Sequence, residues 1–124
     1  MARPYVIVAD DDEIWRDLLE GWLTAEDYCE VKLPSRGKDV LPAAAKRKPD
    51  LFILDHHLGD TTGLAVCACI KADRGLKSVP VIVLTTMAGE MLKIVKGGAP
   101  DHFVVKAEKP DELIDVIERL LPGA

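Results

Sequence analysis

The stretch YVIVADDDE, residues 5–13, decides the fold of this chain. It begins as a short apolar run with β-branched residues, which is typical of a buried strand. It ends in four consecutive acids, which repel one another and mark the end of the strand. A second run, DLFILD at residues 50–55, also ends in an acid, Asp55. Continuous apolar strands are typical of parallel sheets, in which function gathers at the carboxyl ends of the strands.

Apolar runs and helical patterns alternate along the whole chain. Besides residues 5–9 and 50–55, strands are expected at 29–33, 79–85 and 102–106, and helices at 13–25, 37–47, 64–72, 88–96 and 110–121. Asp12 is expected to cap the first helix, Pro42 to shorten or kink the second, and Pro110 to be the first residue of the last. Five strand–helix units predict an α/β fold, a doubly wound five-stranded parallel sheet with helices on both faces.

Length and charge limit the classes of function. The 124 residues suffice for one domain, and the formal net charge of −5 disfavours direct binding to nucleic acid or to an anionic membrane. Three cysteines cannot all pair within one chain, which indicates a reducing compartment. No apolar run approaches the roughly 20 residues of a membrane span. We therefore expect a cytoplasmic protein, with a single domain over residues 1–124 and no effector domain.

Polar side chains follow four of the five predicted strands. They are Asp10, Asp11 and Asp12 after the first strand, Asp55, His56 and His57 after the third, Thr85 and Thr86 after the fourth, and Lys106 after the fifth. In an open parallel sheet these positions converge on one edge. Two carboxylates about 4 Å apart repel by roughly 4 kcal/mol at an effective dielectric constant near 20, so such a cluster takes up a proton or a cation. Oxygen ligands suit Mg²⁺, and a metal beside a carboxylate, a lysine and a threonine suits phosphoryl transfer onto aspartate.

Four segments together carry a family resemblance. In order, VIVADDDE, PDLFILDHHLGDTTG, VPVIVLTT and FVVKAEKPDEL resemble the receiver domain of bacterial two-component response regulators. Asp55 stands 45 residues after Asp10, 30 before Thr85 and eight before Gly63, and these spacings are typical of that family. The resemblance covers essentially the whole chain. It implies a flavodoxin-like sheet with strand order 2-1-3-4-5, as in stand-alone chemotaxis regulators.

The resemblance also implies a role for each residue of the predicted site. Asp55 is the phosphoacceptor, Lys106 pairs with the phosphoryl group, and Mg²⁺ is held by Asp10, Asp11, Asp55 and the backbone carbonyl of His57. Thr85 carries the switch together with an aromatic residue of the last strand, Phe103, with His102 as the alternative. The implied partners are a sensor histidine kinase or phosphotransfer protein, and an output protein on the face of the fourth helix, fifth strand and fifth helix. A phosphorylation-dependent homodimer is a further alternative.

Two positions depart from the family pattern. Ala107 replaces the proline that usually follows the lysine through a cis bond, so the Lys106–Ala107 bond is either cis at a cost of roughly 3 kcal/mol or lies in an altered loop. Gly59 stands where the family often has proline. A third departure is that the stretch from Thr85 to Lys106 is about one residue shorter than is usual in the family, so the fourth helix must be trimmed. Ala107 and this irregular fourth-helix region keep open a phosphorylation-independent docking module. The acidic cleft alone keeps open a small phosphohydrolase with an aspartyl-phosphate intermediate. The chain either acts alone or is a piece of a larger regulator.

Two pairs of aromatic residues have alternative interpretations. His56 and His57 look like a metal-binding pair, but adjacent residues in a loop rarely aim both rings at one ion. Trp15 and Trp22 are seven residues apart and share one face of the first helix. Packing in the core is favoured over a partner-binding role for these two tryptophans.

Overall fold

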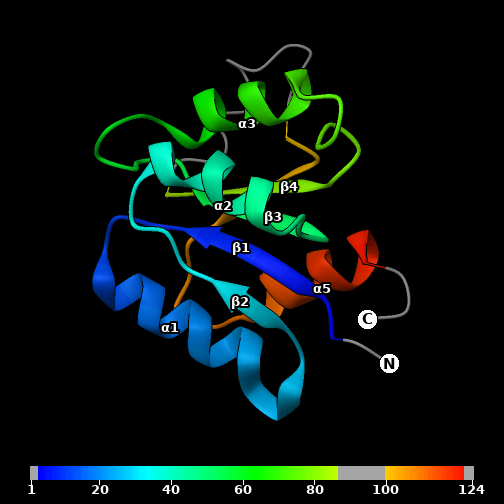
Figure 1. The fold of residues 1–124 in the computed structure, drawn as a ribbon. Helices are drawn as coiled ribbons and strands as arrows, with labels where there is room; N and C mark the ends of the chain where they lie inside the picture. The colour runs from blue at the N-terminus through cyan, green and yellow to red at the C-terminus, as the bar shows by residue number, and fades with distance from the viewer. Residues whose placement is uncertain (1–2, 87–99, 122–124) are drawn as a thin grey trace.

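The computed structural model describes residues 3–86 and 100–121, and within them five strands form one parallel sheet in the order β2-β1-β3-β4-β5 (Figure 1). The strands are β1 (Tyr5–Ala9), β2 (Glu30–Lys32), β3 (Leu51–Asp55), β4 (Val81–Thr85) and β5 (His102–Val105). The helices are α1 (Glu13–Thr24), α2 (Val40–Lys46), α3 (Gly63–Ala72) and α5 (Asp111–Leu120), with 3₁₀ turns η1 (Ala25–Asp27) and η2 (Gly37–Asp39). The predicted fold class and strand order are confirmed. The helix predicted at 88–96 lies outside the described residues.

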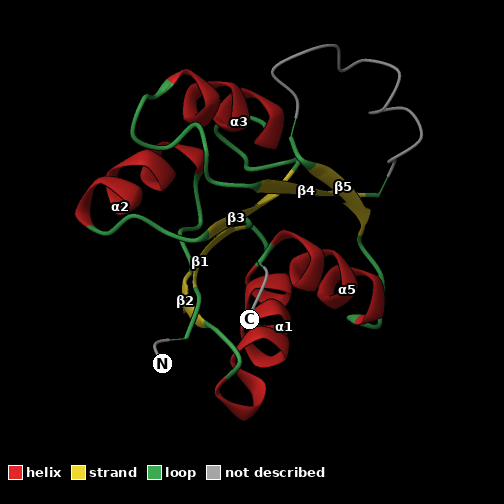
Figure 2. Ribbon diagram, turned by 90° about the vertical axis from the view of Figure 1, so that its right-hand side faces the viewer, coloured by secondary structure: helices red, strands yellow, loops and turns green. Residues whose placement is uncertain are grey.

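Helices cover both faces of the sheet. Figure 2 shows α2 and α3 on one face and α1 and α5 on the other. Alternate residues of each strand face the two helical layers, as the two-residue period of a strand requires. Ile7 and Val83 pack in the cluster that contains residues of α2 and α3. Val8 and Leu84 pack in the cluster that contains residues of α1 and α5. The three central strands are buried along their whole length, which explains their continuous apolar sequences.

The helix boundaries follow local signals in the sequence. The side chain of Asp12 accepts a hydrogen bond from Ile14 N at 2.8 Å and caps α1, as predicted. Pro42 lies in the first turn of α2, where its missing N–H removes no helical hydrogen bond, and the helix has only seven residues. Pro110 occupies the N-cap of α5, so its prediction as the first helical residue was wrong by one position.

The register of the sheet sets the strand ends at one level. Ala9 pairs with Leu54, so Asp10 follows β1 at the level of Asp55. Asp55 pairs with Leu84, and the next residue of β4, Thr85, pairs with Val105. The residues predicted to form a site are therefore brought to one edge by strand pairing alone.

Within the described residues, no helix is long and apolar enough to cross a bilayer.

Gly63, the first residue of α3, lies against the end of β3. A Cβ built on Gly63 would lie 2.5 Å from the carbonyl oxygen of Asp55, which is too close for any contact between backbone and side chain. We predict that Gly63→Ala lowers the free energy of unfolding by about 1–3 kcal/mol, because the α3 backbone or the end of β3 must shift.

Gly21→Ala is the matched control. Gly21 lies within α1 with nothing within 4 Å of its built Cβ. This substitution is expected to raise the free energy of unfolding by roughly 0.5–1 kcal/mol, because alanine is the better helix former. Urea unfolding of both variants measures the difference, and equal effects would contradict the close approach at Gly63.

Candidate functional site

Three carboxylates meet at the carboxyl ends of β1 and β3. Asp10, Asp11 and Asp55 each offer one oxygen within 4.8 Å of the other two. Asp10 is fully buried and Asp55 is 6% exposed, whereas Asp11 is exposed to solvent. Buried carboxylates at this distance repel one another strongly because little water screens them. The cluster therefore needs positive charge.

Lys106 supplies positive charge from the end of β5. Its Nζ lies 2.8 Å from Asp10 Oδ2 and 3.1 Å from Asp55 Oδ1, and its side chain is 9% exposed. The backbone N–H of Lys106 donates to the carbonyl of Thr85 at 3.0 Å, so β5 is held to β4 up to this residue. No peptide bond among the described residues is cis, and Lys106 reaches both carboxylates although a trans bond joins it to Ala107.

Backbone contacts fix Asp10 in the loop between β1 and α1. Asp12 N donates to Asp10 Oδ1 at 2.9 Å, and the Arg16 guanidinium donates to the backbone carbonyl of Asp10 at 2.8 Å. Asp10 is thus committed to protein partners, while Asp11 projects toward solvent. The role of Arg16 could not be predicted from the sequence, since an arginine in a helix is normally a solvated side chain.

The pKa values of Asp55 and Lys106 show how the charges interact. Burial, followed by the negative charge of Asp10, raises the pKa of Asp55 above its ordinary value of 3.8, although Lys106 acts in the opposite direction. For Lys106, burial by itself would lower the pKa. The hydrogen bond and charge of Asp10, followed by those of Asp55, outweigh burial and raise the Lys106 pKa above 10.5. Lys106 is therefore protonated at neutral pH, but its effect on the pKa of Asp55 is outweighed by burial and by the charge of Asp10.

The donor set fits a hard divalent cation. Three carboxylate oxygens gather at one point, and the pKa of Asp55 is raised by burial and then by the charge of Asp10, although Lys106 lies beside it. Mg²⁺ is bound in proteins by a few carboxylates together with water and phosphate oxygens. Exposure of Asp11 leaves solvent access on the side where such further ligands would enter. This cluster could hold Mg²⁺ without rearrangement of the sheet.

The loop between β3 and α3 closes over the cluster. His57 is exposed and forms an isolated antiparallel bridge with Thr62. Gly59 has φ of +78°, a conformation that proline cannot adopt, and a Cβ built on it would lie 3.6 Å from Asp11 Oδ2. The Asp60 carboxylate accepts from Gly37 N at 2.8 Å and from Lys38 N at 2.9 Å, and so ties the loop to η2. The assignment of the His57 carbonyl as a metal ligand stays a prediction.

Alternation along β5 separates the two aromatic candidates for the switch. Phe103 pairs with Val83 and packs, half-buried, against the cluster on the α2–α3 face. Thr85 is two residues after Val83, so it projects to that same face. His102 pairs with Ile82, whose side chain belongs to the opposite cluster. Only Phe103 of these two shares a face with Thr85.

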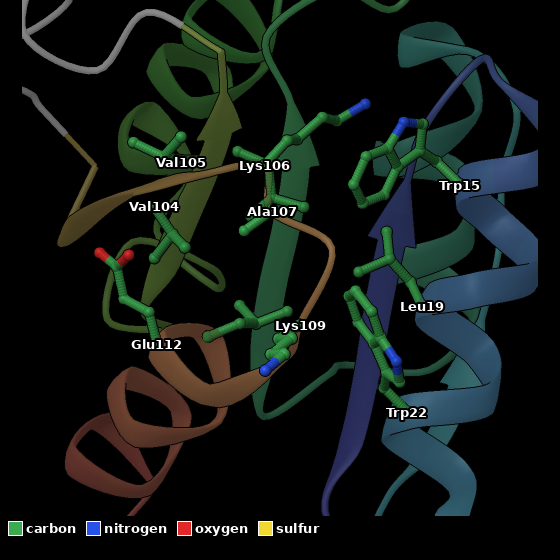
Figure 3. A pocket seen from close by; sticks show the side chains of 11 residues that line it. Trp15, Leu19, Trp22, Val104, Val105, Lys106, Ala107, Lys109 and Glu112 are labelled. Atoms are coloured by element: carbon green, nitrogen blue, oxygen red, sulfur yellow. The ribbon is translucent and has the colours of Figure 1, made fainter.

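The other aromatic pairs differ in how well they were predicted. The rings of His56 and His57 meet edge-on at 4.7 Å, and the metal-ligand cluster found among the described residues contains neither. Trp22 packs against the core, as predicted. Trp15 does not; it is half-buried and its ring lies 4.8 Å from Lys106 Nζ (Figure 3). The expectation that Trp15 packs in the core was wrong. Helical spacing predicts that two residues share a face of the helix, but it does not predict which residues of other elements each of them contacts.

Comparison with known proteins shows the family. A family model described as the response regulator receiver domain matches residues 6–118. The chain belongs to this family. Receiver domains are signalling switches of two-component systems and not classical enzymes, and Mg²⁺ binding at an acidic cluster is typical of them.

Curated relatives and solved structures agree with this membership. The receiver domain is 33% identical over 121 residues to the transcriptional regulatory protein GltR of Pseudomonas aeruginosa, covering 96% of this chain and 49% of GltR. It is 35% identical over 100 residues to the response regulator PleD of Caulobacter vibrioides, covering 79% of this chain and 22% of PleD. The chain thus spans at most about half the length of these relatives.

Two solved structures are similar over nearly the whole receiver domain. The chemotaxis protein CheY4 of Vibrio cholerae has a TM-score of 0.88 at 26% identity, covering 97% of this chain and all of CheY4 (100%). The response regulator TrrA of Thermotoga maritima, solved in complex with Mg²⁺-BeF, has a TM-score of 0.85 at 29% identity, covering 95% of this chain and 99% of TrrA.

The raised pKa of Asp55 predicts a pH dependence of stability. The folded protein holds the Asp55 proton more tightly than the unfolded chain does, so the free energy of unfolding falls as pH rises from about 3.8 through the raised pKa. Asp55→Asn removes this loss. Without divalent ions, the variant should be more stable than the wild type at pH 7, by on the order of 1 kcal/mol. The difference should vanish below pH 3.8, where both side chains are neutral.

Urea unfolding with a chelator across this pH range measures the difference. Asp12→Asn is the matched control, since asparagine also caps a helix and Asp12 lies outside the carboxylate cluster. A variant Asp55→Asn that is less stable than the wild type at pH 7 would contradict the raised pKa of Asp55, to which burial contributes most and Asp10 next.

Proposed function

We propose that this receiver domain is a phosphorylation-activated switch that accepts a phosphoryl group on Asp55 from a histidine kinase or a phosphotransfer protein. The observation that carries the proposal is the bridging of Asp10 and Asp55 by Lys106 Nζ, with the Asp11 carboxylate in the same cluster. This arrangement combines a carboxylate nucleophile, a fixed ammonium and a set of oxygen ligands at one solvent-accessible edge. Phosphoryl transfer depends almost entirely on such positioning and charge stabilisation.

The proposed transfer step is a nucleophilic displacement at phosphorus. A carboxylate oxygen of Asp55 forms the new bond to phosphorus, while the P–N bond to the donor histidine breaks and its electron pair stays on the imidazole nitrogen. Inactivation occurs by hydrolysis: a water oxygen forms a bond to phosphorus, the bond to Asp55 breaks, and inorganic phosphate leaves while Asp55 is again a carboxylate. Asp55 is the nucleophile, and Lys106 exchanges its contact with Asp55 for a phosphoryl oxygen.

Asp10, Asp11, Asp55 and the His57 carbonyl are the proposed ligands of Mg²⁺. When bound, Mg²⁺ would offset the negative charge of the carboxylates and of the phosphoryl oxygens. Asp11 is the most available of the three carboxylates, because Asp10 already accepts from Asp12 N and pairs with Lys106.

Three free thiols, those of Cys29, Cys67 and Cys69, fit a reducing cytoplasmic location.

Thr85 and Phe103 are proposed to carry the switch. Thr85 is 3% exposed at the end of β4, next to the strand that carries Asp55, and Phe103 shares its face of the sheet. A phosphoryl group on Asp55 would attract the Thr85 hydroxyl and leave space for the Phe103 ring to turn inward, which shifts a two-state equilibrium. The proposed output surface includes β5 and α5, where a partner protein or a second copy would bind.

The direct test is the mass of the protein after treatment with acetyl phosphate and Mg²⁺. We expect wild type to gain the mass of one phosphoryl group and Asp55→Asn to gain none. Asp60→Asn is the control, since Asp60 is an acid of the adjoining loop that binds η2 and not the cluster. A wild type that gains no phosphoryl group would instead favour a phosphorylation-independent docking module.

Ile14 provides a second test, because it is 77% exposed at the start of α1, beside the site. A protein phosphodonor that docks over the site would remove the apolar area of Ile14 from water, which favours binding. We predict that Ile14→Ser slows phosphotransfer from a phosphorylated histidine protein by about tenfold, a typical loss for an interface anchor. The rate of phosphorylation of Ile14→Ser by acetyl phosphate should stay within about twofold of the wild-type rate, because surface substitutions usually have small effects. Equal slowing with both donors would contradict a docking role.

A further inference from the structure

Trp15 lies directly against the ammonium group of the site. Lys106 Nζ is 4.8 Å from the centre of the Trp15 ring, and Figure 3 shows the lysine side chain extending toward that indole. The same Nζ contacts Asp10 and Asp55 on its other sides. A cation over an indole at this distance is attracted by the negative face of the ring. Lys106 is therefore held between two carboxylates and one aromatic ring.

The indole contact matters because a lysine ammonium is otherwise loosely oriented. Its four-carbon chain is flexible, and its three donors rotate freely. Asp10 and Asp55 restrain it from the cleft side only, and the contact with Asp55 must loosen when a phosphoryl group is attached there. The Trp15 ring lies against the ammonium on the α1 side, and the Lys106 side chain is 9% exposed.

The first turns of α1 are well anchored beside the site. The cap by Asp12 fixes the start of the helix, and Arg16, the residue after Trp15, donates to the backbone carbonyl of Asp10 at 2.8 Å. The Trp15 ring meets Trp22 edge-on, with centroids 6.4 Å apart and planes at 74°. Adjacent residues of one helix thus contact the two members of the Lys106–Asp10 ion pair.

We infer that Trp15 is a positioning residue for phosphoryl transfer, which holds the Lys106 ammonium directed at the phosphoryl group on Asp55. This inference rests on the proposed function. Trp15 touches no reacting atom; it acts by keeping Lys106 from swinging out to solvent when the contact with Asp55 is exchanged for a phosphoryl oxygen. Loss of the ring should slow phosphorylation while the nucleophile and the metal ligands stay in place.

Rates of phosphorylation by acetyl phosphate with Mg²⁺ test the inference. Trp15→Leu keeps apolar bulk but removes the ring face, and we expect a rate constant roughly 2- to 30-fold lower, the range of a partly desolvated cation–π contact. Trp15→Phe keeps a ring and should recover part of the rate. Lys109→Met is the matched control, since Lys109 lines the pocket that Trp15 and Lys106 also line, whereas the ion pairs with Asp10 and Asp55 are made by Lys106. The rate of Lys109→Met should match wild type.

The outcomes separate this inference from the proposed function. A wild type that accepts no phosphoryl group would overturn both. A wild type that is phosphorylated, with Trp15→Leu equally fast, would overturn the inference alone. Rates of Trp15→Phe equal to those of Trp15→Leu would show that apolar bulk and not the ring is what matters, and would also overturn it.

Fluorescence supplies a readout in the resting protein that needs no phosphoryl chemistry. The chain has two tryptophans, so Trp22→Phe leaves Trp15 as the sole tryptophan, which can be excited selectively over the two tyrosines. In this background, Lys106→Met should shift the Trp15 emission, because an adjacent positive charge is removed, and Lys109→Met should leave it unchanged. This measurement keeps Trp15 in place, so it tests the contact between Trp15 and Lys106 even where Trp15→Leu fails to fold. An emission insensitive to Lys106→Met would overturn the contact on which the inference rests.

Discussion

The ion pairs of Lys106 with Asp10 and Asp55 are the interaction on which the site depends. They join the ends of β1, β3 and β5, at the edge of the sheet where three carboxylates and one ammonium meet. Burying such charges is costly, and apolar residues of similar volume would often stabilise a fold more. The arrangement is therefore better suited to binding a cation or a phosphoryl group than to stabilising the fold. Burial, followed by the negative charge of Asp10, raises the pKa of Asp55 despite the adjacent Lys106.

The sheet supplies the geometry that this chemistry needs. Pairing of Ala9 with Leu54 sets Asp10 level with Asp55, and pairing of β4 with β5 brings Lys106 alongside. Close packing then removes freedom, since Gly63 lies against the carbonyl of Asp55. Apolar strands hidden on both faces fix the polar ends rigidly, while the loops that carry Asp11 and His57 stay open to solvent. The result is a rigidly held carboxylate, Asp55, beside a solvent-accessible acidic edge.

Much of the site could be predicted from strand ends alone. Asp10, Asp11, Asp55 and Lys106 were expected together because each follows an apolar run, and parallel strands end at one edge. Asp12 was expected as a cap because an aspartate side chain accepts hydrogen bonds from the free N–H groups at a helix N-terminus, where negative charge is also favourable.

Other features depend on tertiary neighbours that no local pattern reports. Spacing within α1 placed Trp15 and Trp22 on one face, but it could not show that the first of them reaches the lysine of the site. The choice between His102 and Phe103 needed the register of β5 against β4. The position of Lys106 before a trans bond to Ala107 likewise required coordinates, because the sequence left both bond geometries open.

Calorimetric titration of Mg²⁺ into the unphosphorylated protein tests most directly whether the carboxylate cluster is a metal site. We expect one ion per chain for wild type. Asp11→Asn should bind at least about tenfold more weakly, since loss of a direct ligand costs no less than loss of an outer-shell partner. Absence of binding to wild type, or equal affinity in Asp11→Asn, would contradict the assignment of these carboxylates to a metal-assisted phosphoryl transfer.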